Sequence, residues 1–408
     1  MKSMLEFRLT EEQLKLKETI KEFVDKEVKP DCRRREKIED PAQRVPWDWI
    51  TTLSKMGLRT MVVPEEYGGS GVDWHTICVA AEELAVGDLG LAIALNQTWI
   101  FTLNITEVAN DEQRARYLPP FMADDTFLLA AGMTEPDAGS DHFLPYNEPG
   151  HGARTTAVPA QYNGRDGWVI NGRKHYISNG GTAKLYTIMA RTDLTRGGIE
   201  GLSAFFVELG TPGFTIGQIH NKIGQRLVQN AELVFDDCWV PAENLIGVED
   251  RGRESLALVS SKRRRINSES ATALGVGRAA FEDALPYAQQ RVQGGKPIIQ
   301  HQAIKLMLAD MATHIKAARL LIWQAAWNAD HPEEFDPSAG RMANQFASEV
   351  AFQVCKMAVE IFGGAGIMRE SPVEKYLRDA ATLLHSGGTN QINRLRVGDA
   401  LEGLPTLV

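Results

Sequence analysis

The chain has 408 residues, 43% hydrophobic and 24% charged, a length and composition typical of a globular protein with two or three domains. Its formal net charge of −9 argues against bulk nucleic-acid binding, which requires a basic surface. The four cysteines stand far apart and outside any cysteine–histidine cluster, so we expect neither a disulfide framework nor a metal site. The N-terminus has no apolar signal-peptide region and no apolar run reaches transmembrane length, so we expect a cytoplasmic protein without membrane attachment.

Helical patterns fill residues 1–125, which we expect to form an N-terminal helical domain. Thr10 followed by Gln13 predicts a capping box, and the apolar residues after it recur roughly along one stripe. The run TICVAAEELAVGDLGLAIAL, at 76–95, is apolar nearly all round and predicts a buried helix.

The pattern changes near residue 126, where short apolar or alternating runs separated by turn residues begin. Among these turns, Asn171-Gly172 is a strong hairpin signal. We therefore expect an antiparallel β domain over 126–247. Helical periodicity then returns in long segments with short polar breaks, which predicts an antiparallel helical bundle within 248–408.

Three motifs occur along this α–β–α sequence of regions. They are GMTEPDAGSD at 132–141, EIFGGAGIMRESPVEKYLRD at 360–379 and HSGGTNQINR at 385–394. With LTEEQ, PEEYGGSG and VFDDCWVPAENLIG, they make the chain resemble the acyl-CoA dehydrogenase family, collinearly over essentially its whole length. The resemblance implies an α+β multidomain fold with an N-terminal helical domain, a middle β domain and a C-terminal four-helix bundle. It also implies an FAD-dependent oxidoreductase acting on a CoA thioester, as a homodimer or homotetramer.

Each motif also has a physical interpretation. The hydroxyls of Thr134 and Ser140, with nearby main-chain amides, suit a flavin edge and a phosphate-bearing ligand, although an ordinary strand-to-turn transition would use the same residues. The glycines of GGAG allow the backbone to approach a pyrophosphate, and they would equally suit the end of a helix.

The resemblance further implies the residues that meet the ligands. The isoalloxazine is lined by Met133, Thr134, Tyr176 and Ser178. Contacts to FAD across a subunit interface are implied for Arg291, Gln302, Glu360, Gly363 and Gly364, and contacts on the adenine side for Thr389 and Gln391. Ser140 is implied to contact the cofactor and the pantetheine or phosphates of CoA. For Arg291 taken alone, a solvated helix end is the simpler interpretation.

The chain departs from the family at the catalytic base. Members remove the α-proton of the thioester with a carboxylate, while the β-hydrogen passes to the flavin as hydride. Most carry the Glu directly before the Gly-Thr of the third motif, where this chain has Gly387; others carry it on the first long C-terminal helix, where this chain has Arg265. Glycine has no titratable side chain and arginine stays protonated, so neither can be a general base. Both positions are still expected to line the substrate site.

Three hypotheses follow. In the first, the chemistry is altered to oxygenation, elimination or reduction, with Arg265 binding an acidic acyl group or stabilising an enolate. In the second, the chain is an α,β-dehydrogenase with a relocated base, either Glu269, one helical turn after Arg265, or less favourably His385; the simpler role for Glu269 is a structural ion pair with Arg265. In the third, the chain is the FAD-binding partner subunit of a heteromer. Electrons would pass to O2 or to an electron-transfer flavoprotein.

Overall fold

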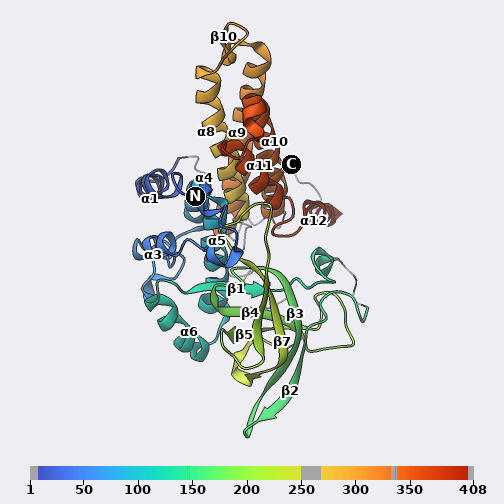
Figure 1. Cartoon of the computed structure of the whole chain (residues 1–408). Helices are drawn as coiled ribbons and strands as arrows, with labels where there is room; N and C mark the ends of the chain where they lie inside the picture. The colour runs from blue at the N-terminus through green and yellow to red at the C-terminus, as the bar shows by residue number, and fades with distance from the viewer. Residues whose placement is uncertain are drawn as a thin grey trace.

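The computed structural model describes residues 8–144, 146, 148–249, 268–331, 336 and 338–402. Figure 1 shows three regions, with the N-terminal helices beside the β domain and the helical bundle rising away from both. This arrangement agrees with the predicted fold class. The domain limits at residues 125 and 247 stay a prediction, because the N-terminal helices and the bundle share one continuous hydrophobic core, which includes Trp99 and Leu274.

The N-terminal region is helical, as predicted. Its α-helices are α1 (Glu11–Phe23), α2 (Cys32–Arg35), α3 (Trp47–Lys55), α4 (Trp74–Gly87), α5 (Leu89–Leu103) and α6 (Asp111–Ala123). Its single turns are η1 (Val24–Val28), η2 (Pro41–Gln43), η3 (Glu65–Tyr67) and η4 (Asn104–Val108). The capping box is confirmed, because the Thr10 hydroxyl accepts the Gln13 N–H at 3.1 Å and the Gln13 side chain accepts the Thr10 N–H at 3.1 Å.

The prediction of one helix over 76–95 was wrong. The chain leaves the helical conformation at Asp88, whose φ is −157°, and this residue separates α4 from α5. The Asp88 carboxylate accepts the N–H of Leu91 at 2.9 Å, so it acts as the N-cap of the second helix. A Gly followed by an Asp can mark the end of one helix and the N-cap of the next. The apolar residues on both sides made this signal easy to overlook.

The middle region forms one eight-stranded sheet in the order β6-β7-β3-β2-β4-β5-β8, with β1 paired to β4. Its strands are β1 (Leu128–Gly132), β2 (Thr156–Tyr162), β3 (Arg165–Ser178), β4 (Ala183–Arg191), β5 (Leu202–Glu208), β6 (Phe214–Ile219), β7 (Asn230–Pro241) and β8 (Leu245–Ile246). The predicted antiparallel pairing holds for most neighbours, but β1 and β2 each run parallel to β4. Short turns η5 (Ser140–Phe143) and η6 (Ala242–Asn244) interrupt the connections.

The predicted hairpin at Asn171-Gly172 was also wrong. Strand β3 runs through both residues, with a register shift at this point. Gly172 has φ +143°, and a Cβ there would lie 2.6 Å from the Thr155 hydroxyl, so the glycine serves a bulge and a close strand approach. The turn that joins β2 to β3 is Asn163-Gly164, where both residues have positive φ.

The C-terminal bundle contains α8 (Glu269–Gln290), α9 (Gln302–Asp330), α10 (Ala339–Phe362), α11 (Pro372–Leu383) and α12 (Asn390–Glu402). Between α8 and α9 the chain forms a small hairpin of β9 (Val292–Gln293) and β10 (Lys296–Pro297), followed by η7 (Ile298–Gln300). Figure 1 shows this hairpin at the top of the molecule. We call it the bundle tip. The turn η9 (Gly363–Ile367) follows α10.

Helix α10 with η9, Ala339–Ile367, is by length and composition long and apolar enough to cross a membrane. Its apolar residues face α8 and α9, and Val354, Cys355 and Ala358 are fully buried there. Packing within the bundle therefore accounts for part of this composition, since 39% of the apolar window is buried.

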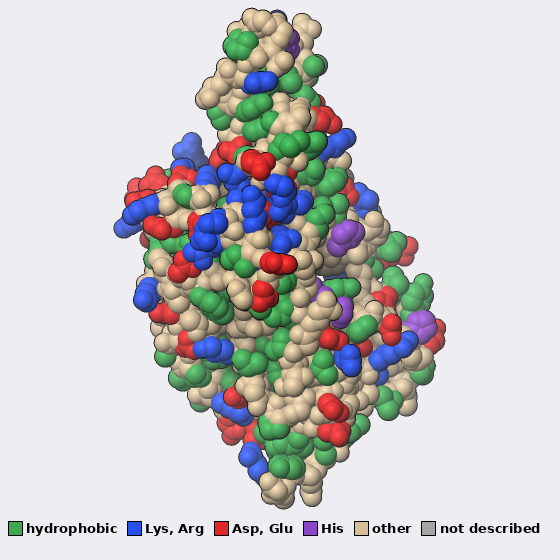
Figure 2. All heavy atoms as spheres, in the orientation of Figure 1, with side chains coloured by type: hydrophobic (Ala, Val, Ile, Leu, Met, Phe, Trp, Pro, Cys, Tyr) green, Lys and Arg blue, Asp and Glu red, His purple; other side chains and the backbone are tan. Residues whose placement is uncertain are grey.

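Figure 2 shows Lys and Arg side chains gathered where the N-terminal helices meet the bundle. Among the contacts between the N-terminal helices and the bundle, the buried Glu36 pairs with Arg378 at 2.7 Å and with Arg369 at 3.9 Å. Burial alone would raise the pKa of Glu36, but the hydrogen bonds from Arg378 and the positive charges of Lys375, Arg378 and Arg369 together outweigh burial and hold the pKa below its usual value. Arg369 and Arg378 thus tie the bundle to the end of α2.

Candidate functional site

The first motif and β3 meet where β1 ends. The carbonyl of Thr134 accepts the N–H of His175 at 2.8 Å, which brings Met133 and Thr134 beside Tyr176. Below them, the fully buried Lys174 pairs with Glu135 at 2.6 Å, and the Glu135 carboxylate also accepts the Arg154 and Thr155 N–H groups. Burial would raise the pKa of Glu135, but Lys174 outweighs it and lowers the pKa. This satisfied ion pair fixes the motif on the sheet.

Tyr176 presents an aromatic ring to the outside of the β domain. Its side chain is 60% exposed, and its φ of +59° belongs to a left-handed conformation that aromatic residues rarely adopt. The rings of His175 and His220 lie beside it, with centroids 4.1 and 4.9 Å from the tyrosine ring. An exposed aromatic face held by a strained bulge suits a planar ligand such as isoalloxazine.

Ser178 lies at the end of β3, directly opposite Asn230 of β7. Together with Met133, Thr134 and Tyr176 it forms what we call the ring wall. The structure therefore brings together all four residues that the resemblance implies for the isoalloxazine, and their contacts with FAD stay a prediction.

A residue of the third motif contacts a residue of the first motif. The Thr389 N–H donates to the Ser140 hydroxyl at 3.1 Å, and the Thr389 hydroxyl accepts the Ile392 N–H at 3.3 Å where α12 begins. Gln391 is exposed on the first turn of that helix. The structure thus joins residues 249 positions apart that were both expected at the ligand.

Gly387 is exposed and has φ +65°, followed by Gly388 with φ +88°. Both values lie in the left-handed region that glycine adopts without cost. At the position where the resemblance implies a catalytic base, this chain therefore has no side chain and a backbone conformation unfavourable to one. His385, the weaker candidate base, is exposed after α11.

Glu269 lies at the first turn of α8 with 8% of its surface exposed. The side-chain amide of Gln97 on α5 donates to its carboxylate at 2.8 Å. Three residues earlier, about 4.5 Å along the same helix, the Ala94 carbonyl accepts from Asn179, the neighbour of Ser178. Helix α5 thus links Glu269 to the ring wall. Arg265 lies outside the described residues.

The remaining predicted residues form a second group at the bundle tip. Arg291 follows the last residue of α8, and because this helix has 22 residues, Arg291 lies about 33 Å from Glu269. Gln302 begins α9 on the other side of the hairpin. The ring of Tyr287 stacks on Phe362 at 3.9 Å, which places η9 beside the tip. Arg291, Gln302, Glu360, Gly363 and Gly364 therefore lie far from the ring wall of the same chain.

The glycine loop in this second group has open space in front of it. Gly363 has φ +60°, and a Cβ on Gly364 would meet no atom within 4 Å. Packing inside the chain thus does not require a glycine at 364, whereas a pyrophosphate approaching the backbone would. Glu360, by contrast, is exposed and lies 3.8 Å from Lys356. The residues of both groups fit FAD, one group to its ring and the other to its diphosphate.

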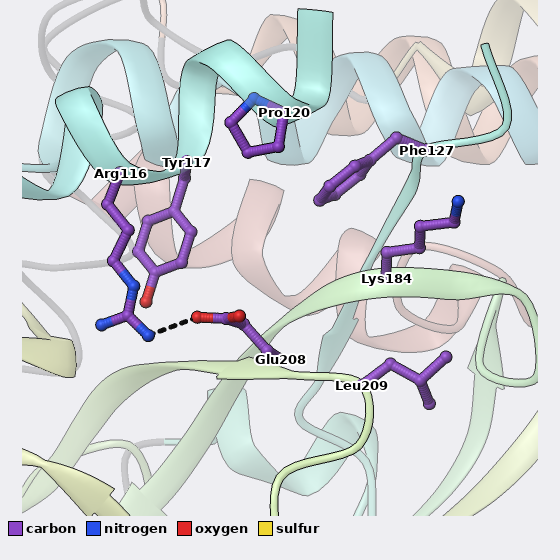
Figure 3. A pocket seen from close by; sticks show the side chains of 7 residues that line it. All are labelled: Arg116, Tyr117, Pro120, Phe127, Lys184, Glu208 and Leu209. Carbon is purple, nitrogen blue, oxygen red and sulfur yellow. Dashed lines mark hydrogen bonds and ion pairs between the residues drawn. The ribbon is translucent and has the colours of Figure 1, made fainter. Parts of the chain in front are cut away.

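A surface pocket of about 320 Å³ lies elsewhere, between α6 and the ends of β4 and β5. Figure 3 shows Arg116 and Glu208 paired across it, with Tyr117 beside them. None of the predicted site residues lines this pocket, so it is separate from the ring wall. In the ranges that the structure covers, no cluster of His, Cys, Asp and Glu could hold a metal ion.

The sequence reasoning missed four residues that contact the ring wall or Glu269, and a fifth that contacts one of the four. The four are Gln97, His175, His220 and Asn230, and the fifth is Lys222, which donates to Asn230. His175 directly precedes Tyr176 in the sequence, so one signal was available. The others reach the site through strand register and helix packing, for which the sequence gives no local signal.

Three family profiles match the chain in order: "Acyl-CoA dehydrogenase, N-terminal domain" over 10–125, "middle domain" over 130–238 and "C-terminal domain" over 263–402. An acyl-CoA dehydrogenase of Bacillus subtilis (strain 168) is 38% identical over 396 residues, 97% of this chain and 99% of the relative. The structure of butyryl-CoA dehydrogenase from Megasphaera elsdenii has a TM-score of 0.87 and 36% identity, covering 97% and 100% of the two chains. The prolyl acyl carrier protein oxidase AnaB has a TM-score of 0.83 and 27% identity, with coverage of 97% and 100%.

Proposed function

The chain belongs to the acyl-CoA dehydrogenase family and is an FAD-dependent oxidoreductase; from this premise we propose that it acts on an acyl thioester by a reaction other than the usual α,β-dehydrogenation. The observation that carries the proposal is Gly387. It offers no titratable group at the usual base position, and its φ of +65° disfavours any other residue there. Loss of a general base typically slows such a step by about 10²–10⁴-fold.

The groups for a different reaction are present in the sequence. FAD, when bound, would supply two-electron redox chemistry against the ring wall, and Ser140 would contact the pantetheine or phosphates of CoA. Arg265 would bind an acidic acyl group or stabilise a developing enolate. The likeness to the prolyl acyl carrier protein oxidase supports O2 as the electron acceptor. The likeness to a chain in the solved structure of an electron transferring flavoprotein of Acidaminococcus fermentans supports an electron-transfer flavoprotein instead.

A second candidate is a dehydrogenase with Glu269 as its base. The buried position of Glu269 and its hydrogen bond from Gln97 favour this candidate, because a base must be held in one orientation close to the substrate. Glu269, on the first turn of α8, would then act in place of the carboxylate that is absent at position 387.

We further propose a homodimer or homotetramer in which each FAD is held by two chains. The distance of about 33 Å along α8 between the ring wall side and the bundle tip supports this assembly. One chain would supply Met133, Thr134, Tyr176 and Ser178, and its neighbour the tip residues.

The deciding experiment is an anaerobic titration of the FAD-loaded protein with a panel of acyl-CoAs, followed by admission of O2. We expect saturated straight-chain butyryl-, octanoyl- and palmitoyl-CoA to bleach the flavin slowly. Rapid bleaching by any of them would refute the altered chemistry. Glu269→Gln would then identify the base, since lost bleaching with retained binding points to Glu269. Glu282→Gln, which alters a half-exposed carboxylate on the same helix, is the matched control.

A further inference from the structure

We propose that Asn230 is a positioning residue of the flavin site: its side-chain amide directs the Ser178 hydroxyl proton toward the flavin, and Lys222 fixes the direction of that amide. The inference rests on FAD binding at the ring wall and is independent of the reaction proposed above.

Asn230 contacts two residues of the ring wall at once. Its Nδ2 donates to the carbonyl of Tyr176 at 2.8 Å and to the hydroxyl oxygen of Ser178 at 3.2 Å. Asn230 is the first residue of β7 and pairs in register with Ser178, so the backbone ladder holds the amide at this place. One side chain therefore supports both residues that line the ring from β3.

The direction of the amide is determined from both of its ends. Lys222 donates to the Asn230 Oδ1 at 2.5 Å and to the Val228 carbonyl at 2.8 Å. An ammonium has no lone pair to accept a hydrogen bond, and the Tyr176 carbonyl has no proton to donate. A flipped amide would set donor against donor and acceptor against acceptor, so only one orientation satisfies all partners. Burial lowers the pKa of Lys222 to about 7, and a neutral amine keeps the two protons that this geometry needs. In that form the amine also has a lone pair, and the acceptor-only carbonyl of Tyr176 then determines the direction of the amide.

The fixed amide has a consequence for Ser178. Because its oxygen accepts from Asn230, the hydroxyl proton has to point to another acceptor. No protein group within the described ranges is recorded as accepting it, and Ser178 is one of the residues expected along the isoalloxazine. Ser178 thus acts toward the flavin as a hydrogen-bond donor, which a serine without this partner would do only part of the time.

The same amide also supports the strained bulge. The left-handed region is sterically unfavourable for a non-glycine residue, and Tyr176 is held there with φ +59°. The hydrogen bond from Asn230 to the Tyr176 carbonyl fixes the peptide that follows the strained residue. The exposed ring is thereby held at a constant angle for stacking.

Asn230→Asp is the sharpest test, because it changes one donor group into an acceptor with almost no change in shape. The oxygen that faces Lys222 is retained, while the Ser178 proton turns toward the new carboxylate and the Tyr176 carbonyl loses its donor. We expect the FAD dissociation constant, measured by flavin fluorescence quenching without substrate, to rise about ten-fold, with a shifted visible absorption band in the loaded protein. Asn163→Asp, at the exposed β2–β3 turn, should leave both unchanged.

A double-mutant cycle with Ser178→Ala separates positioning from general damage. If Asn230 acts through the serine, Asn230→Asp should weaken FAD binding at most three-fold in the Ser178→Ala background. An equal loss in both backgrounds would overturn the proposal. Lys222→Met gives an independent arm, because it frees the amide to turn without touching the ring wall. We expect it to weaken FAD binding three-fold or more, and an unchanged dissociation constant with an unchanged absorption band would likewise refute the role of Lys222.

Discussion

At the scale of single residues, the left-handed backbone at Gly387 disfavours a side chain at this position. An ordinary residue at φ +65° costs about 1–2 kcal/mol. If the chain lacks a base here, as proposed above, the backbone also favours keeping glycine at this position.

Gly387→Glu should restore α-proton removal at the expense of stability. We expect flavin reduction by butyryl-CoA to become about 10²-fold faster or more, in the range typical of a general base, together with a lower Tm. Stopped-flow absorbance under anaerobic conditions measures the rate. Gly387→Gln carries the same strain without the base, so equal rates in the two variants would contradict the prediction.

Asp330 predicts a pH dependence of stability. Its carboxylate accepts the Trp74 N–H at 3.1 Å and joins the end of α9 to the start of α4, and burial raises its pKa to about 6. Between about pH 4 and 6 the folded state therefore binds more protons than the unfolded state. The protonated Asp330 favours the folded state over the ionised form, and this contribution to the free energy of unfolding is lost as the pH rises through 6. Asp330→Asn stays neutral and should raise Tm relative to the native protein more at pH 8 than at pH 4.5. A differential scanning measurement at both pH values checks this, with the exposed Asp166→Asn as control. A smaller difference at pH 8 would contradict it.

At the scale of elements, α4 and α8 approach so closely that one glycine is required. A Cβ on Gly275 would lie 2.4 Å from the Glu82 carbonyl, whereas a Cβ on Gly277 would lie 3.4 Å from the nearest atom, in Ala351. Gly275→Ala should cost about 1–3 kcal/mol through overpacking. Gly277→Ala should be neutral or stabilise by up to about 1 kcal/mol, because alanine favours helix. Thermal unfolding of both variants provides the comparison, and equal Tm values would show that the helices adjust.

Elements also show where sequence reasoning succeeds. Periodicity located the helical and β regions, and the Thr10 capping box was confirmed because its signal is local. The break at Asp88 and the bulge at Gly172 were missed, because apolar runs and an Asn-Gly pair have the same local signature in more than one structure. Motifs gave the ring wall, but Asn230 reaches it only through the register between β3 and β7, which no local pattern encodes.

At the scale of the whole molecule, the division of the predicted FAD residues between ring wall and bundle tip predicts complementation between chains. A variant with Arg291→Ala and Gln302→Ala should lose FAD, as should one with Tyr176→Ala and Ser178→Ala. Mixed oligomers purified through two different tags should recover one FAD for every two chains, because one intact site forms from the unaltered halves. Absorbance at the flavin band measures the ratio. Full FAD retention by the tip variant alone would contradict the shared site.

The division of the site between two chains also makes FAD binding depend on protein concentration. If each site exists only between chains, dilution that separates the chains also releases FAD, and by reciprocity bound FAD tightens the association. The yellow colour of a solution would then depend on protein concentration as well as on cofactor supply. In a cell making few copies of this chain, scarcity of the polypeptide would have the same effect as scarcity of the vitamin from which the flavin is made.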